Sequence, residues 1–234
     1  MKSYKHIPII TDITAFEERV DEITSTTDYE TVKHTISSLK KALYANPDCA
    51  ALCAPQIGVD LRLFVVKTAK SESQRFHIFL NPLIISSEGL HLSRETNLSL
   101  PNKQFIIPRK DKVHVAFQKE DGKVDSETYF GAYGEVVQQM IEMLDGITLA
   151  DYGLDLDDIG GPAAYDKATK KQQVEIMAMY LESLKLDSAA LTSEIEESPE
   201  LKNLNDTIDF MAGMLKGDIT PLKERPDADK VKKD

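Results

Sequence analysis

The sequence predicts an α+β fold, because a helix, a series of short antiparallel strands and a second helix follow one another over its first two-thirds. The first helix is indicated by apolar residues that recur at intervals of three and four. The strands are indicated by short runs that are apolar or that alternate between apolar and polar residues. A further apolar stripe of helical period indicates the second helix.

The first helix is expected to begin near Thr27 and to stop near Asn46. In residues 27–30, the Thr hydroxyl and the Glu carboxylate can each satisfy an unpaired backbone amide, as in a capping box. The apolar face that follows consists of Val32, Ile36, Leu39 and Leu43. Pro47 ends the helix, because the residue before a proline disfavours the helical conformation.

Strands are expected at residues 61–67, 76–80, 112–118 and 124–130. The second of these is expected to end at Asn81-Pro82. The third alternates, with Val113, Val115 and Phe117 on one face and polar residues on the other. Asp121-Gly122 supplies the positive φ values of the tight turn between the last two strands.

The second helix is expected over about residues 133–144, with Gly146 as its C-cap. Its apolar face consists of Val136, Met140, Met143 and Leu144. Together with the preceding strands, this helix completes a first domain that we expect to span residues 1–154.

Composition changes after residue 154, and we expect residues 155–234 to form an acidic, mainly helical C-terminal extension with a disordered tail. This segment has 18 acidic and 11 basic residues, which gives −7 of the chain's net charge of −11. Its two apolar stripes consist of Val174, Met177, Tyr180, Leu181 and Leu184, and of Ile208, Met211 and Leu215. These acidic helices could dock a partner or simply present a solvated face.

The overall charge and the cysteine count exclude several classes of protein. An acidic chain with a pI near 5.0 does not suit nucleic-acid binding, which needs clustered Lys and Arg. Cys49 and Cys53 are too few for a disulfide framework. No run of apolar residues is long enough for a signal peptide or a membrane span. We therefore expect a protein without nucleic-acid or membrane partners, in the cytoplasm of a cell or an infected host or associated with a virion.

Three segments carry the strongest functional signal, and they occur in a fixed order. Residues 51–58 have the sequence A-L-C-A-P-Q-I-G, residues 95–101 E-T-N-L-S-L-P, and residues 138–146 Q-Q-M-I-E-M-L-D-G. They resemble the peptide deformylase motifs G-L-A-A-P-Q-I-G, E-G-C-L-S-x-P and Q-H-E-x-D-H-L-x-G. The resemblance, which also includes Asn81-Pro82 and Pro108-Arg109, covers roughly residues 1–152. It implies that family's fold, with antiparallel sheets around a central helix.

The resemblance also implies a particular chemistry. In that family one Cys and two His hold a divalent metal, and the two His lie four residues apart on one helix face. The metal lowers the pKa of a bound water, and a Glu between the two His transfers the proton. A Gln side chain and a backbone amide stabilise the oxyanion that forms.

This sequence departs from the family at each position that carries the metal or the proton. The resemblance places Asn97 at the Cys, Gln139 and Met143 at the two His, and Met140 at the Glu. Amides and thioethers are weak ligands for such metals, and Met140 cannot titrate. We therefore expect no catalytic residue, metal or cofactor. Gln56 and the backbone amide of Leu98 remain as peptide-binding groups of the groove.

Several alternatives remain open at individual residues. Cys53 could be a nucleophile or a small buried hydrophobe, and Cys49, Cys53 and His91 could form a displaced metal site. Met140 and Met143 could bind copper or fill the former metal cavity with apolar atoms. Gln56 could contact a ligand or only hydrogen-bond within the fold.

These residues predict a non-catalytic member of the family, a pseudoenzyme that acts in protein binding or assembly. Its partner would be a protein or peptide that binds the former substrate groove or the C-terminal helices, because strand addition needs no metal. Assembly of a phage virion or tail is one setting. Two alternatives are a deformylase-like hydrolase that uses displaced catalytic groups, and a binder of nascent chains at the ribosome.

Overall fold

In the computed structural model, the described residues are 7–68, 75–169, 172–173, 176–177 and 180. Among these residues, the longer helices are α1 (Tyr29–Ala45) and α2 (Gly131–Leu144), and the shorter ones are α3 (Leu149–Tyr152) and α4 (Pro162–Lys167). The strands are β1 (Ala51–Cys53), β2 (Leu63–Thr68), β3 (Arg75–Glu88), β4 (His91–Asn97), β5 (Leu100–Arg109), β6 (Lys112–Gln118), β7 (Val124–Phe130) and β8 (Leu154–Asp155). Single 3-10 turns occur at Ile13–Phe16, Ala54–Ile57 and Leu156–Ile159.

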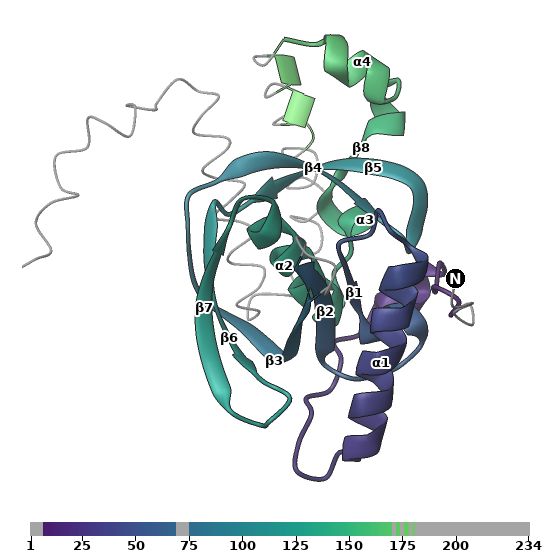
Figure 1. Ribbon diagram of the computed structural model, residues 1–234. Helices are drawn as coiled ribbons and strands as arrows, with labels where there is room; N and C mark the ends of the chain where they lie inside the picture. The colour runs from purple at the N-terminus through teal and green to yellow at the C-terminus, as the bar shows by residue number, and fades with distance from the viewer. Residues whose placement is uncertain (1–6, 69–74, 170–171, 174–175, 178–179, 181–234) are drawn as a thin grey trace, which may run out of the picture. The chain divides into compact units, whose positions relative to one another are not determined.

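The strands form two antiparallel sheets, one of order β1-β2-β3-β6-β7 and one of order β4-β5-β8. Figure 1 shows α2 enclosed by strands of both sheets. This arrangement confirms the predicted α+β fold with antiparallel sheets around a central helix.

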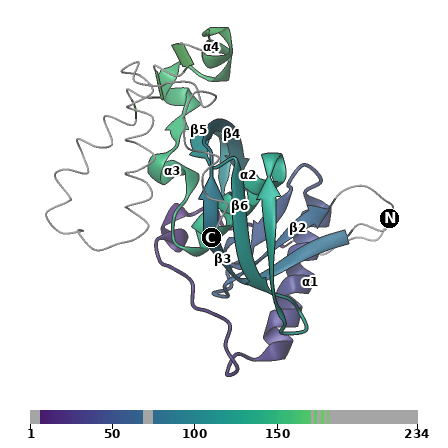
Figure 2. The ribbon, with the colours of Figure 1, turned by 90° about the vertical axis from the view of Figure 1, so that its left-hand side faces the viewer.

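The side chains of β2 alternate between two apolar clusters, because successive residues of a strand point to opposite faces. Phe64 and Val66 pack with α2, whereas Leu63 and Val65 pack with α1. Both faces of the larger sheet are therefore covered near β1 and β2, and Figure 2 shows α1 beside β2. This packing fixes the segment after β1, which carries Gln56.

The beginning of α1 differs in detail from the predicted capping box. Asp28 is the N-cap, and its carboxylate accepts hydrogen bonds from the backbone N–H groups of Glu30 and Thr31 and from the Thr31 hydroxyl. The Thr27 hydroxyl instead accepts from the backbone N–H of Thr24. A carboxylate one residue further along competes better for these amides, because it is charged and has two acceptor oxygens.

The predicted end of a strand at Asn81-Pro82 is wrong, because β3 continues through these residues to Glu88. The register shifts between Leu80 and Leu83, and Asn81 has a φ of 47°. The Asn81 side chain accepts from the N–H of Ile23 and donates to its C=O, so the bulge is anchored.

The chain divides into two compact units, Met1–Pro162 and Ala163–Asp234. The pairing of β8 with β5 joins residues 154–155 to the first unit, which extends to Pro162. The expected helical stripes of the C-terminal extension fall almost entirely outside the described residues. In the described part of the chain, no helix combines the length and the apolar character that crossing a bilayer requires.

Candidate functional site

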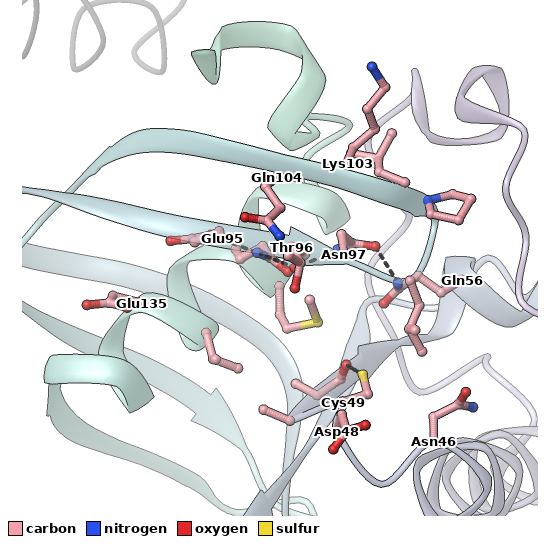
Figure 3. A pocket seen from close by; sticks show the side chains of 18 of the residues that line it. Asn46, Asp48, Cys49, Gln56, Glu95, Thr96, Asn97, Lys103, Gln104 and Glu135 are labelled. Atoms are coloured by element: carbon pink, nitrogen blue, oxygen red, sulfur yellow. Dashed lines mark hydrogen bonds between the residues drawn. The ribbon is translucent and has the colours of Figure 1, made fainter. Parts of the chain in front are cut away.

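A groove of about 650 Å³ lies in the first unit, where the segment around β1, the strands β4 and β5, and the first turns of α2 meet. Figure 3 shows the side chains of 18 of the residues that line it. Five of the six residues singled out from the sequence line this groove: Gln56, Asn97, Leu98, Gln139 and Met140. The sixth, Met143, lies directly behind it against Asn97. Positions that are up to 87 residues apart in the chain are thus brought together.

Gln56 is held at one end of the groove with 1% of its surface exposed. It lies in the 3-10 turn Ala54–Ile57, where its Oε1 accepts the backbone N–H of Cys53 at 3.1 Å. Its Nε2 donates to Asn97 Oδ1 at 3.0 Å and to Ser99 Oγ at 3.2 Å. Both donor hydrogens of this amide therefore already have acceptors within the fold.

Asn97 and Gln139 continue this chain of amides across the groove. Asn97 Nδ2 donates to Gln139 Oε1 at 2.9 Å and lies 3.1 Å from Met143 Sδ. Gln139 Nε2 donates to Glu95 Oε2 at 2.7 Å. Met140, with 2% of its surface exposed, belongs to the apolar core beside this chain. The amide chain Gln56–Asn97–Gln139–Glu95 thus links β4, α2 and the turn after β1.

A buried ion cluster supports the end of the amide chain. Arg109 binds Glu95 through two hydrogen bonds of 2.6 and 2.8 Å, and it binds Glu142 at 2.7 Å. The Tyr152 hydroxyl donates to Glu142 at 2.6 Å. Burial lowers the pKa of Arg109, but the two carboxylates outweigh it and raise that pKa well above its usual value. For the Tyr152 hydroxyl, burial acts in the opposite direction and raises the pKa well above its usual value.

A second polar cluster lies where α2 begins. Glu135 Oε1 lies 2.9 Å from His91 Nε2, and Glu135 Oε2 accepts from the Ser93 hydroxyl at 3.0 Å. The other ring nitrogen of His91 lies 2.8 Å from Asp111 Oδ1. Partial burial lowers the pKa of His91, but the hydrogen bonds with Glu135 and Asp111 outweigh it and raise the pKa above its usual value of 6.5.

Sequence reasoning assigned no role to Glu95, Arg109 or Glu135. Glu95 and Arg109 are both part of the segments that resemble the family, so their pairing could have been inferred as a buried ion pair. Glu135 lies outside those segments, and its partners His91 and Ser93 are more than 40 residues away in the chain. Only the fold brings this cluster together.

The two cysteines are not activated thiols. Cys53 is fully buried, and burial raises the pKa of its thiol to about 12. Cys49 lines the groove, but burial raises the pKa of its thiol too, and its Sγ donates to the carbonyl of Ala51. A thiol with a raised pKa is a poor nucleophile, so this geometry favours the interpretation of Cys53 as a small buried hydrophobe.

The divalent metal that the resemblance implies does not fit the side chains at these positions. Asn97 directs N–H groups toward Gln139 and Met143, and its Oδ1 accepts from Gln56 and from the backbone N–H of Ser99. Amide and thioether atoms that satisfy one another make a poor ligand set for a hard or borderline cation. Across the residues that the structure describes, no three His, Cys, Asp or Glu side chains converge on a point that could hold a metal ion.

The fold and the groove define a protein of the deformylase class, and comparisons with known proteins agree. The family model described as polypeptide deformylase matches residues 9–158, so the chain belongs to this family. It is 37% identical over 117 residues to a peptide deformylase of Thermodesulfovibrio yellowstonii, a match that covers 50% of this chain and 70% of the relative. It is 30% identical over 142 residues to one of Desulfotalea psychrophila, with 60% and 76% covered.

Among solved structures, the chain is similar to a probable peptide deformylase from Synechococcus phage S-SSM7. The two are 29% identical with a TM-score of 0.58, and the match covers 62% of this chain and 99% of the phage protein. A peptide deformylase from Thermotoga maritima superposes with a TM-score of 0.55 at 24% identity, which shows the shared fold.

The prediction of a non-catalytic pseudoenzyme that acts in binding or assembly is wrong by these comparisons. The relatives carry the name of an enzyme, peptide deformylase, and the family model is that of the same enzyme. None of these relatives carries a name that indicates assembly or a non-catalytic role. The comparisons favour the alternative of a deformylase-like hydrolase.

Proposed function

We propose that this chain is a deformylase-type hydrolase, which removes the formyl group from the N-terminus of a peptide that lies in the groove. Two observations support the proposal. The chain belongs to a family whose named relatives are peptide deformylases, and its groove places the amide of Gln56 beside Leu98 and Asn97. The peptide is the partner that the groove would bind.

The family's metal and proton-transfer positions correspond in this proposal to four neutral side chains. Asn97 occupies the position of the Cys, Gln139 and Met143 occupy those of the two His, and Met140 occupies that of the Glu. The mutual contacts of Asn97, Gln139 and Met143 support this correspondence, because metal ligands must also converge on one point. The water-activating groups are then displaced from their usual positions.

Gln56 and the backbone N–H of Leu98 are the groups that this chain offers to polarise a formyl carbonyl. Gln56 Nε2 is bonded to Asn97 and Ser99, so a substrate carbonyl must replace one of these acceptors. Donors aimed at a developing oxyanion each contribute about 10²–10³ to the rate constant. These donors lower the barrier but do not generate the attacking hydroxide.

Hydrolysis by this chain should therefore be slow. A positioned general base contributes about 10²–10⁴ to the rate, and Met140 cannot supply it. We expect turnover above the uncatalysed background that is at least about 10² below that of a relative with the complete site.

The test is hydrolysis of formyl-Met-Ala-Ser by the purified full chain, with release of the free amine measured against a protein-free blank. Metal content is determined on the same preparation by elemental analysis. Slow, saturable turnover that scales with protein concentration supports the proposal. Turnover equal to the blank would overturn it, whether or not a peptide binds.

A further inference from the structure

We propose that the groove selects peptides that carry a lysine or arginine side chain, and that Glu135 sets this preference. The inference rests on the proposed function, because it takes the groove as the place where a peptide binds. It concerns which peptides bind, and it does not depend on how fast they are hydrolysed.

Glu135 lies at the opposite end of the groove from Gln56. Figure 3 shows Gln56 at one side of the view, Glu135 at the other and Glu95 between them. Glu135 lies on α2 four residues before Gln139, which places it one helical turn, about 5–6 Å between Cβ atoms, from the amide chain. A peptide whose formyl carbonyl is polarised by Gln56 could thus extend one of its side chains toward Glu135.

The negative charge at this end is not neutralised by its neighbours. Glu135 and Asp111 share His91, and Lys112 pairs with Glu88 and lies within Coulombic range of Asp111. Even with His91 protonated, two cations face the three carboxylates of Glu135, Asp111 and Glu88, so one negative charge is left uncompensated. The Glu135 carboxylate is also partly accessible, with 25% of its side chain exposed, so a ligand can reach it.

The buried ion cluster behind the groove adds to this field. Arg109 carries one positive charge against the carboxylates of Glu95 and Glu142. Glu95 lines the groove near the end at which Glu135 lies. One negative charge thus remains in a region of low dielectric constant, where charges act over a longer range than in water.

The two cations that line the groove are engaged elsewhere. Lys103 Nζ lies 2.7 Å from Asp155 and 3.3 Å from Asp157, so that trio is itself net negative. Arg94 lies on the opposite face of β4 from Glu95, because successive residues of a strand point to opposite faces. Its guanidinium donates to the carbonyl of Pro162. At the other end, Asp48 lies within Coulombic range of Lys67. The cations that line the groove therefore leave the negative charge near Glu135 in place.

A bound carboxylate or phosphate would be repelled by this end, whereas a lysine or arginine side chain would find both charge and acceptor oxygens. Fixed charges in a partly enclosed site discriminate between ligands of opposite charge. The chemistry that fits is a formylated peptide with a basic residue shortly after its first residue.

The test is the binding of N-formylated tripeptides to the full-length chain, measured by isothermal titration calorimetry. Peptides with lysine at the second or third position are compared with counterparts that carry norleucine, which has nearly the same shape without the charge. We expect one lysine peptide to bind about 5–10 times more tightly than its counterpart at about 50 mM salt. The ratio should shrink at about 1 M salt, where charges are strongly screened.

Glu135→Gln is the decisive variant, because it removes the charge and keeps the shape and the hydrogen-bonding capacity toward Ser93. It should reduce the lysine preference to about twofold or less. Glu120→Gln, at an exposed turn between β6 and β7, removes an equal charge away from the groove and should leave the preference intact. Cooperative thermal unfolding of both variants shows that they are folded.

The outcomes separate this inference from the proposed function. Equal affinity for lysine and norleucine peptides, or a preference that persists in Glu135→Gln, would overturn the role of Glu135. Binding with the lysine preference but without hydrolysis of any peptide would overturn the proposed function and support the charge preference. No binding of any formylated peptide would overturn both.

Discussion

At the scale of single residues, the site consists of buried polar groups that satisfy one another. No buried side-chain polar atom in the described part of the chain lacks a hydrogen-bond partner. This matters because an unpaired buried polar group costs about 1–3 kcal/mol, and an unpaired buried charge costs more. The amide chain and the ion cluster therefore stabilise the fold only as a complete set.

Arg109 is the residue on which this set depends most. Replacing it by Met keeps much of its volume but leaves the carboxylates of Glu95 and Glu142 without their cation. Removing one partner of a buried ion pair costs about 3–5 kcal/mol, so we expect Arg109→Met to lower the free energy of unfolding by that amount. Urea denaturation measures it.

Arg94→Met is the matched control, because Arg94 is exposed on the same sheet. It should change the free energy of unfolding far less, since exposed charges contribute little. Equal losses in the two variants would show that the ion cluster does not stabilise the fold as described.

His91 should make stability depend on pH. Its pKa is raised in the folded chain, so its charged form stabilises the fold fully below the ordinary value of 6.5. This contribution is lost as the pH rises above 6.5 and through the raised pKa. We expect the stability difference between the native chain and His91→Ala to shrink over that range, as measured by urea denaturation at a series of pH values.

The matched control is His34→Ala, which removes an exposed histidine of α1. It is measured over the same pH range, so that the effect of removing a histidine elsewhere in the chain can be subtracted. A difference at His91 that grows with pH would contradict the assignment of His91 as a cation held by Glu135 and Asp111.

At the scale of elements, periodicity predicted the helices and the strands with apolar faces, but it missed β4 and β5. In β4 the buried positions are Ser93 and Glu95, so the usual alternation of apolar and polar residues is absent. These polar residues can be buried because Glu135 and Arg109 bind them, and both partners are distant in sequence. A short-range pattern cannot reveal such a strand.

The cap of α1 gives a test at the same scale. Asp28→Ala removes the acceptor of the Glu30 and Thr31 amides, and it should lower the melting temperature by a few degrees. Thr27→Ala, at the cap position that the sequence predicted, should lower it less. Thermal unfolding by circular dichroism compares the two, and a larger loss in Thr27→Ala would restore the predicted capping box.

At the scale of the whole molecule, the ordered motifs predicted the family, because three segments far apart in the chain match one enzyme. The family model at residues 9–158 agrees closely with the resemblance over residues 1–152. The prediction about function failed, because it inferred a loss of activity from four side chains alone. Relatives at 30% and 37% identity are named as enzymes.

The groove itself could be predicted only in part. Gln56, Asn97 and Gln139 were singled out from their motifs, and the structure joins them by hydrogen bonds. The hydrogen bonds of Gln56 to Cys53, Asn97 and Ser99 agree with the interpretation of Gln56 as a group bonded within the fold. Its contact with a peptide stays a prediction, as does the role of Leu98.

The proposed hydrolysis and the correspondence of the four positions are tested most directly by restoring the four family side chains at once. The variant Asn97→Cys, Gln139→His, Met140→Glu and Met143→His is compared with the native chain in hydrolysis of formyl-Met-Ala-Ser, with metal content and thermal unfolding measured on both. We predict slow turnover by the native chain, and in the folded variant about one divalent metal per chain and turnover at least about 10² faster. A folded variant with neither metal nor faster turnover would contradict the correspondence of these four positions, and native turnover equal to the blank would contradict the proposed hydrolysis.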